Sequence, residues 1–84
     1  MKRIAYSKAA LKALGRMPAN VSAMIRSKVE QYAGDLTAQS RNVSRLKNMD
    51  GVYRLQVGDW RVLFTEDGEI IAVIKVAPRG SAYD

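Results

Sequence analysis

The side chains that could do chemistry in this 84-residue chain are mainly cationic. There are 14 lysines and arginines against 8 aspartates and glutamates, which gives a net charge of +6, and there is neither histidine nor cysteine. Disulfides and zinc or iron sites built on the usual soft ligands are therefore excluded, and so is the usual histidine acid–base pair. The basic balance predicts a polyanionic partner, with nucleic acid first, although a merely well-solvated or ribosome-associated basic protein would share this composition.

Polar residues in the second half are spaced so that they meet on one face of a β-sheet. Residues 52–57 alternate, residues 60–65 resume as a strand after a Gly-Asp turn, and residues 69–76 form a β-branched run after another turn. We expect an antiparallel meander of these three segments, in which successive side chains point to opposite faces. One face then carries Arg54, Gln56, Arg61 and Lys75. Cations that converge on an open face are costly to leave unpaired, so this face is predicted to bind an anion.

The other face of the meander is uniformly apolar, and we expect helices to cover it. Trp60 could stack on a nucleic-acid base, but it points with Val62 and Phe64 toward this face, which favours core packing. The residues expected on the covered face are Tyr53, Leu55, Val57, Trp60, Val62, Phe64, Ile70, Ala72, Ile74 and Val76.

The first half supplies the helices. After an extended segment over residues 2–6, Ser7 is a good N-cap for a helix over residues 8–14, which the following glycine can end. A second helix begins around Pro18 and ends at the Gly-Asp pair of residues 34–35, with Met24 and Tyr32 among its apolar positions. Helices followed by a meander predict an α+β fold. The helix residues expected to contact the sheet are Leu11, Leu14, Val21, Ile25 and Val29.

The chain is expected to form a single domain over residues 1–84, since typical domains run to roughly 100–150 residues. Residues 36–42 are polar, without periodicity, and read as a loop too short to link two domains. No apolar stretch approaches the roughly 20 residues of a membrane span. We therefore expect no membrane association and a cytoplasmic protein.

Residues 46–64, LKNMDGVYRLQVGDWRVLF, resemble the RelE/ParE toxins, whose pattern here reads LKG, D-G-YRLRVGDYRVIY. The segment from Lys8 through Met17-Pro18 is similar to their SKKALKALKKLP, and residues 75–83 resemble their closing strand and R-x-x-x-Y tail. The resemblance implies their fold, a β-strand, two helices and a three-stranded meander. It also implies an antitoxin protein that wraps and silences the toxin. RelE-like members are ribosome-dependent mRNA endonucleases, whereas ParE-like members inhibit DNA gyrase and lack the nuclease residues.

The resemblance implies roles for particular residues as well. RelE-like nucleases let the RNA 2′-hydroxyl attack the phosphate, with no metal or cofactor, and leave a 2′,3′-cyclic phosphate and a 5′-hydroxyl. Arg61 matches a phosphate-binding arginine, and Arg79 matches one that stabilises the transition state or protonates the leaving oxygen. Tyr83 matches a terminal tyrosine that can stack on a base or assist at the phosphate. The alternatives are a salt bridge from Arg61 to Asp59 or Glu66, a solvated tail arginine and a terminal ring packed on the core.

Two positions depart from the nuclease pattern. Gln56 aligns with a lysine that acts as general base in well-studied members, and glutamine cannot usefully accept a proton. Pro78 stands where many relatives have histidine. Lys47 and Lys75 are the candidates to replace the base, and Arg54 sits where RelE-like enzymes often carry a basic residue. The expected RNA-binding set is therefore Lys47, Arg54, Gln56 and Lys75.

Three functions stay open on these residues. The paired arginines and the terminal tyrosine favour an mRNA endonuclease acting on the ribosome, while the missing histidine and Gln56 favour a gyrase inhibitor that cuts nothing. A degenerate toxin that only helps its antitoxin repress their operon is the third. Lys8, Lys12 and Arg16, at i, i+4 and i+8 on the first helix, form either a ribosome-docking stripe or an ordinary solvated helix face.

Overall fold

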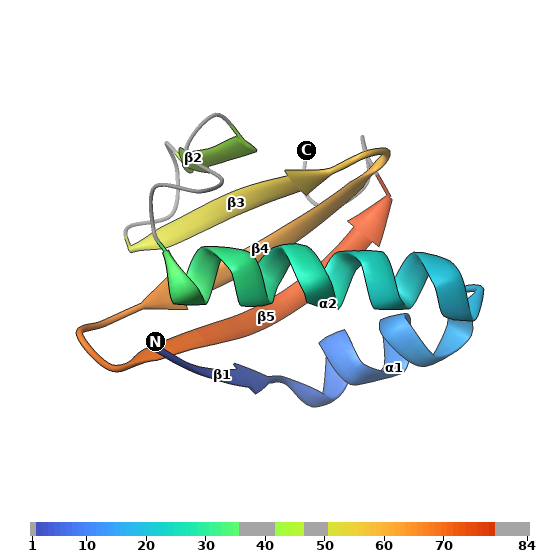
Figure 1. The fold of residues 1–84 in the computed structure, drawn as a ribbon, viewed down its shortest axis with the longest axis horizontal. Helices are drawn as coiled ribbons and strands as arrows, with labels where there is room; N and C mark the ends of the chain where they lie inside the picture. Colours follow the sequence, from blue (N-terminus) through green and yellow to red (C-terminus); the bar gives the residue numbers. More distant parts are fainter. Residues whose placement is uncertain (1, 36–41, 47–50, 79–84) are drawn as a thin grey trace.

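Two helices pack on one face of a five-stranded mixed sheet. The computed structural model describes residues 2–35, 42–46 and 51–78. Figure 1 shows α2 lying in front of β4 and β5, with α1 beside it. The elements are β1 (Arg3–Tyr6), α1 (Lys8–Arg16), α2 (Ala19–Gly34), β2 (Val43–Arg45), β3 (Val52–Val57), β4 (Trp60–Glu66) and β5 (Ile70–Pro78). This is the α+β layout predicted from the sequence.

The strand order is β1-β5-β4-β3-β2. β1 runs parallel to β5, and the other neighbouring pairs are antiparallel. The meander of β3, β4 and β5 is therefore confirmed, and the extended segment at the start of the chain joins it beside β5. β2 was not predicted, because three residues are too few to show a period of two. Its pairing with β3, Ser44 opposite Arg54, is what makes it a strand.

α1 begins where the sequence predicts, because the Ser7 hydroxyl accepts a hydrogen bond from the backbone N–H of Ala10 at 3.0 Å. The helix continues through Gly15 to Arg16, two residues beyond the expected end. α2 begins directly after Pro18, a residue that has no backbone N–H to leave unsatisfied. Both helices are short and depend on burial of one face for their stability.

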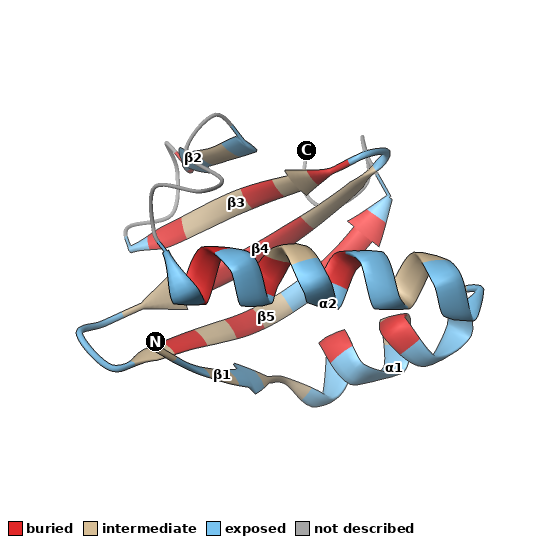
Figure 2. Cartoon of the chain, viewed as in Figure 1, coloured by how far each residue is buried: buried red, intermediate tan, exposed pale blue. Residues whose placement is uncertain are grey.

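The core lies between the helices and the sheet, and Figure 2 shows buried residues along the sides of the helices that meet the strands. Leu14, Ile25 and Val29 are buried there as predicted, with Val21 half-buried beside them. The helix residues buried in this core are Ala10, Leu14, Ile25, Val29, Tyr32 and Ala33.

One expected core residue is on the surface instead. Leu11 is 47% exposed, so that prediction was wrong, and Met24, one of the apolar positions of the second helix, is 43% exposed as well. α1 packs with Ala10 and Leu14 toward the sheet, one turn apart on the same side of the helix. With Ala10 and Leu14 turned inward, Leu11 lies on the exposed side of α1.

β5 changes phase part-way along its length. Phe64 on β4 lies opposite Val73, but the preceding residue Leu63 lies opposite Lys75. Ile74 is therefore an extra residue on β5 with no partner on β4, a β-bulge. Residues before the bulge consequently lie on the face opposite to that expected from unbroken alternation.

This bulge corrects the predicted core. Ile70, Ala72 and Ile74 were expected under the helices and are not in that core, where Ile71 and Val73 take their place. Val76, which follows the bulge, is buried there as expected. Trp60 is half-buried against the same core, which confirms packing rather than an exposed stacking ring. The remaining sheet residues confirmed on the covered face are Tyr53, Leu55, Val57, Val62 and Phe64.

Candidate nucleic-acid interface

The sheet face turned away from the helices collects cationic side chains from three strands. Gln56 on β3 lies directly opposite Arg61 on β4. Arg54 lies opposite Leu63, and Leu63 lies opposite Lys75 on β5. Side chains that face each other across a sheet have Cβ atoms about 4.5–5.5 Å apart. The structure thus places the four polar residues predicted for this face, Arg54, Gln56, Arg61 and Lys75, on one surface, which we call the cationic face.

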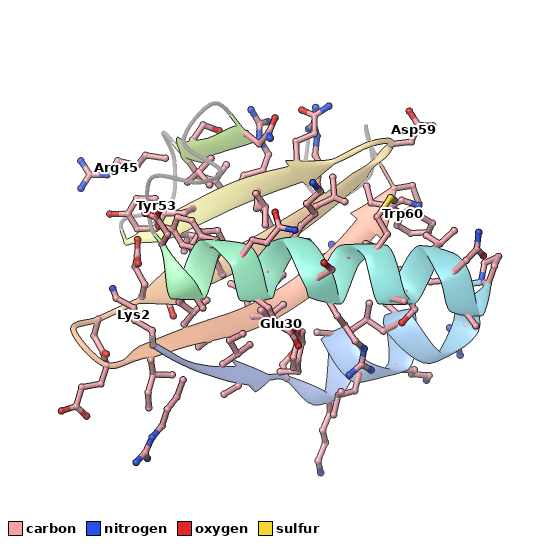
Figure 3. The ribbon with its side chains drawn as sticks, viewed as in Figure 1. Lys2, Glu30, Arg45, Tyr53, Asp59 and Trp60 are labelled. Carbon is pink, nitrogen blue, oxygen red and sulfur yellow. The ribbon has the colours of Figure 1, made fainter. Side chains whose placement is uncertain are left out.

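The β3–β4 turn holds Gln56 and Arg61 in register. Gly58 has φ = +57°, a left-handed conformation that glycine adopts without a steric penalty. The Gln56 side-chain amide donates a hydrogen bond to the carbonyl of Gly58 at 3.4 Å. Asp59 projects from this turn, as Figure 3 shows. A tight hairpin therefore fixes the end of the cationic face that lies next to this turn.

The cationic face is partly buried. Arg54, Gln56 and Arg61 are half-buried, whereas Lys75 is exposed. The Nε atom of Arg61 is buried, so the stem of that side chain lies against the sheet. A charge held close to protein acts through a lower effective dielectric than one extended into water. An anion reaching this surface would meet guanidinium groups with restricted freedom.

An apolar patch adjoins these cations on the same face. Leu46, Val52 and Leu63 are buried in a cluster of their own, and Ile74 packs against it half-buried. Leu63 belongs to this patch and also separates Arg54 from Lys75 in the row across the sheet. The cations of this face therefore lie beside a small apolar cluster that is itself buried.

Arg3 is a further cation on this side that the sequence reasoning missed. β1 pairs with β5, and its Ile4 and Tyr6 pack against the main core. Alternation then directs Arg3, which is exposed, to the opposite face. An extended segment was predicted over residues 2–6, but placing Arg3 on this face required knowing that the segment joins the sheet.

The described strand residues on the cationic side include no carboxylate. Glu66, considered as a partner for Arg61, points to the helix side. Its Oε2 lies 2.9 Å from Nζ of Lys2, and its Oε1 accepts a hydrogen bond from the Tyr32 hydroxyl at 2.5 Å. Burial and the bond to Glu66 raise the pKa of Tyr32. The Arg61–Glu66 salt bridge is therefore wrong, because residues 61 and 66 lie on opposite faces of β4.

The Asp67 carboxylate likewise makes hydrogen bonds within the protein. Asp67 lies in the β4–β5 turn, where its carboxylate accepts the backbone N–H groups of Glu69 at 2.7 Å and Ile70 at 2.8 Å. These hydrogen bonds hold the pKa of Asp67 below its usual value. Lys2 also donates to the backbone carbonyl of Asp67 at 2.7 Å. The acidic groups at this end of the sheet thus stabilise the turn and the start of the chain.

The predicted basic stripe lies on a different surface. Lys8, Lys12 and Arg16 are all exposed on α1, on the side away from the buried Ala10 and Leu14. α1 belongs to the helix layer, so the stripe and the cationic face are not brought together. They form two separate basic surfaces.

A shallow apolar hollow of about 420 Å³ lies where α1 meets α2. The Arg26 guanidinium carbon sits 5.4 Å from the centre of the Tyr6 ring, a cation–π distance, and burial raises the pKa of Tyr6. The hollow is lined by Leu14, Gly15, Met17, Ala19, Ser22, Ala23 and Arg26. With a single charged group in its lining, it offers no acid–base chemistry.

Three predicted site residues, Lys47, Arg79 and Tyr83, lie outside the described residues. Within the part of the chain that the structure describes, no cluster of acidic, histidine or cysteine side chains could hold a metal ion. No helix in that part is both long and apolar enough to cross a membrane.

Comparison with known proteins identifies the family. A family model described as "ParE toxin of type II toxin-antitoxin system, parDE" matches residues 4–83. The chain belongs to this toxin family. The RelE/ParE resemblance carried by residues 46–64 is thereby confirmed. Toxin RelE3 of Methanocaldococcus jannaschii is 25% identical over 84 residues, which cover 98% of this chain and 96% of that toxin.

Solved structures of RelE toxins share the fold. The archaeal RelE–RelB complex from Pyrococcus horikoshii matches with a TM-score of 0.78 and 23% identity, covering 96% of this chain and 98% of the matched chain. The isolated RelE toxin of E. coli matches with a TM-score of 0.76 and 15% identity, over 99% of this chain and 89% of the other. The helix pair on one side of a mixed sheet is therefore the RelE arrangement.

Proposed function

We propose that this type II toxin is RelE-like in activity and cleaves mRNA on the ribosome. The observation that supports this proposal is the cationic face, where Arg54, Arg61 and Lys75 share a surface with no carboxylate among the described strand residues. Such a surface is suited to the phosphates of a single RNA strand. It also fits a reaction whose main requirement is to stabilise negative charge on the oxygens of the phosphorane.

In the proposed reaction the RNA 2′-oxygen attacks the adjacent phosphorus and the bond to the 5′-oxygen breaks. The products are a 2′,3′-cyclic phosphate and a 5′-hydroxyl, and one proton passes from the 2′-oxygen to the 5′-oxygen through the protein or solvent. Arg61 pairs with the phosphate oxygens through its planar fork. Arg79 neutralises or protonates the departing oxygen, and Tyr83 orients a base.

The general base in this chain must be a different residue from the lysine that serves in better-equipped relatives. Gln56, opposite Arg61, occupies the position of the lysine in better-equipped relatives and cannot take up a proton. Lys75 shares the cationic face and is exposed, so it can reach a bound strand, and Lys47 is the second candidate. Proton transfer typically contributes about 10²–10⁴-fold. A weak base therefore slows the reaction without abolishing it.

The ribosome would supply the positioning that the small domain lacks. Lys8, Lys12 and Arg16 on α1 would dock on ribosomal RNA while the cationic face meets the mRNA in the decoding site. Holding reacting groups in an attack geometry can lower a barrier by about 7–11 kcal/mol. Two separate basic surfaces suit a protein that must bind ribosomal RNA and mRNA at the same time.

An antitoxin is the proposed protein partner. The matched structures include RelE bound to RelB, and a basic toxin favours an acidic segment. We expect that segment, a helix or an extended strand, to lie over Arg54, Arg61 and Arg79. An antitoxin that binds the folded toxin and not the unfolded chain would raise the thermal stability of the toxin. This assignment would be contradicted if the neighbouring gene encoded no small protein that binds the toxin and reverses its toxicity.

The decisive experiment is primer extension on mRNA in programmed ribosomes, with and without the protein. Cleavage within the coding sequence, together with loss of labelled methionine incorporation in cells, supports the nuclease. The second candidate function is gyrase inhibition, which the matched ParE family and Gln56 favour. Intact mRNA, inhibited supercoiling and loss of labelled thymidine incorporation would establish it. If the protein neither cleaves mRNA nor inhibits supercoiling, but still helps its antitoxin to repress their operon, it is a degenerate toxin.

A further inference from the structure

The β-bulge of β5 decides which way Lys75 points. With unbroken pairing beyond Phe64 and Val73, Lys75 would lie opposite Val62 instead of Leu63. Val62 has no exposed surface and lies in the core beneath the helices. A strand that continued from Val73 in the same register would therefore direct a lysine into the apolar core. The extra residue, Ile74, sends Lys75 to the cationic face instead.

Ser7 ties this bulge to the start of α1. Its hydroxyl donates a hydrogen bond to the carbonyl of Ile74 at 2.8 Å and accepts one from the N–H of Ala10 at 3.0 Å. Its own N–H donates to the carbonyl of Val73 at 2.9 Å. A bulge leaves backbone groups outside the regular ladder. Ser7 satisfies the carbonyl of the bulged residue while it caps the helix.

We propose that Ser7 is a positioning residue for RNA binding: its hydroxyl holds the bulge at Ile74 and so keeps Lys75 in the row with Arg54 on the cationic face. The inference rests on the proposed function, since it assumes that this face binds the RNA backbone. Ser7 itself lies at the β1–α1 junction, is half-buried, and is not expected to touch RNA. Its effect on binding must therefore pass through Lys75.

The variants separate the two hydrogen bonds of the Ser7 hydroxyl. Ser7→Gly leaves a residue that caps a helix with a loss of only a few tenths of a kcal/mol, but it removes the donor to Ile74. Ser7→Thr keeps a hydroxyl that can make both bonds. Lys75→Ala removes the cation that the bulge positions. Tyr32→Phe, which removes the hydrogen bond to Glu66 on the helix side, is the control for general destabilisation.

The measurement is the affinity for a short 2′-O-methyl oligoribonucleotide, which has no free 2′-hydroxyl, as a function of salt concentration. Each phosphate contact to a single strand contributes about 0.7 to the slope of log affinity against log salt. We expect Lys75→Ala to lower the slope by about that amount, Ser7→Gly to lower it as well, and Ser7→Thr and Tyr32→Phe to leave it unchanged. In a Lys75→Ala background, Ser7→Gly should have no further effect.

Additive effects of Ser7→Gly and Lys75→Ala, or an unchanged slope in either single variant, would overturn the inference. If Ser7→Gly does not fold, Ser7→Asp retains the cap but cannot donate to Ile74, and it is compared with Ala9→Asp, which adds the same charge to an exposed position of the first turn. Equal slopes in that pair would also overturn it. Failure of the proposed function is a distinct result: wild type and Arg61→Ala would then bind the oligoribonucleotide equally.

Discussion

Replacing Arg61 with alanine removes one guanidinium from the cationic face. Arg61 lies opposite Gln56 on β3 and Ala77 on β5, on the side away from the helices, so the substitution leaves the main core covered. Losing one preorganised donor to a developing oxyanion typically costs about 2.7–4 kcal/mol. Cleavage should therefore slow by about 10²–10³-fold, since each 1.36 kcal/mol is about tenfold in rate. Arg61→Lys should recover little, because an ammonium cannot reproduce the bidentate fork.

The assay is the rate of mRNA cleavage in programmed ribosomes at saturating toxin. Arg45→Ala is the matched control, because Arg45 is also a sheet arginine but lies 5.9 Å from the centre of the Tyr53 ring, on the side of the covered face. It should cleave at close to the wild-type rate. A folded Arg61→Ala protein that cleaves as fast as wild type would refute the role of Arg61. Equal slowing of both variants would show a general charge effect instead.

Three further predictions concern single side chains. Gln56→Lys should accelerate cleavage if the missing base limits the rate, and an unchanged single-turnover rate would mean that proton abstraction is not limiting. Tyr32→Phe should lower the free energy of unfolding in urea by about 1.5–3 kcal/mol, because it removes a hydrogen bond to the Glu66 carboxylate, and a change near zero would contradict that contribution. The pKa of Asp67 is lowered in the folded state, so its stabilisation is present above its unfolded value, near 3.9, and is lost as pH falls through the folded value. Urea unfolding should thus show that Asp67→Asn is less stable than wild type at neutral pH and that the difference shrinks as the pH falls. A difference in stability that is the same at both pH values would contradict this role.

Local sequence patterns determined much of this protein. The Ser7 cap, the periodicity of α2 and the alternation of β3 and β4 each depend on neighbours along the chain, and each was predicted in the right place. The same alternation is enough to assign Gln56 and Arg61 to one face, because both residues lie within a single hairpin. The family resemblance added roles to those positions, because its motif falls within the same hairpin.

Tertiary structure decided the features that depend on partners distant in sequence. The bulge at Ile74 arises from pairing with β4 and from the Ser7 hydroxyl, which lies 67 residues away along the chain. β2 exists only because β3 accepts it, and the side of α1 that faces inward was chosen by its packing on β5. Hydrophobic periodicity describes one segment at a time, whereas register and helix rotation minimise exposed surface over several segments together. Alternation alone was enough to place Lys75 on the cationic face, but only the bulge decided that Ile71 and Val73 lie beneath the helices in place of Ile70 and Ala72.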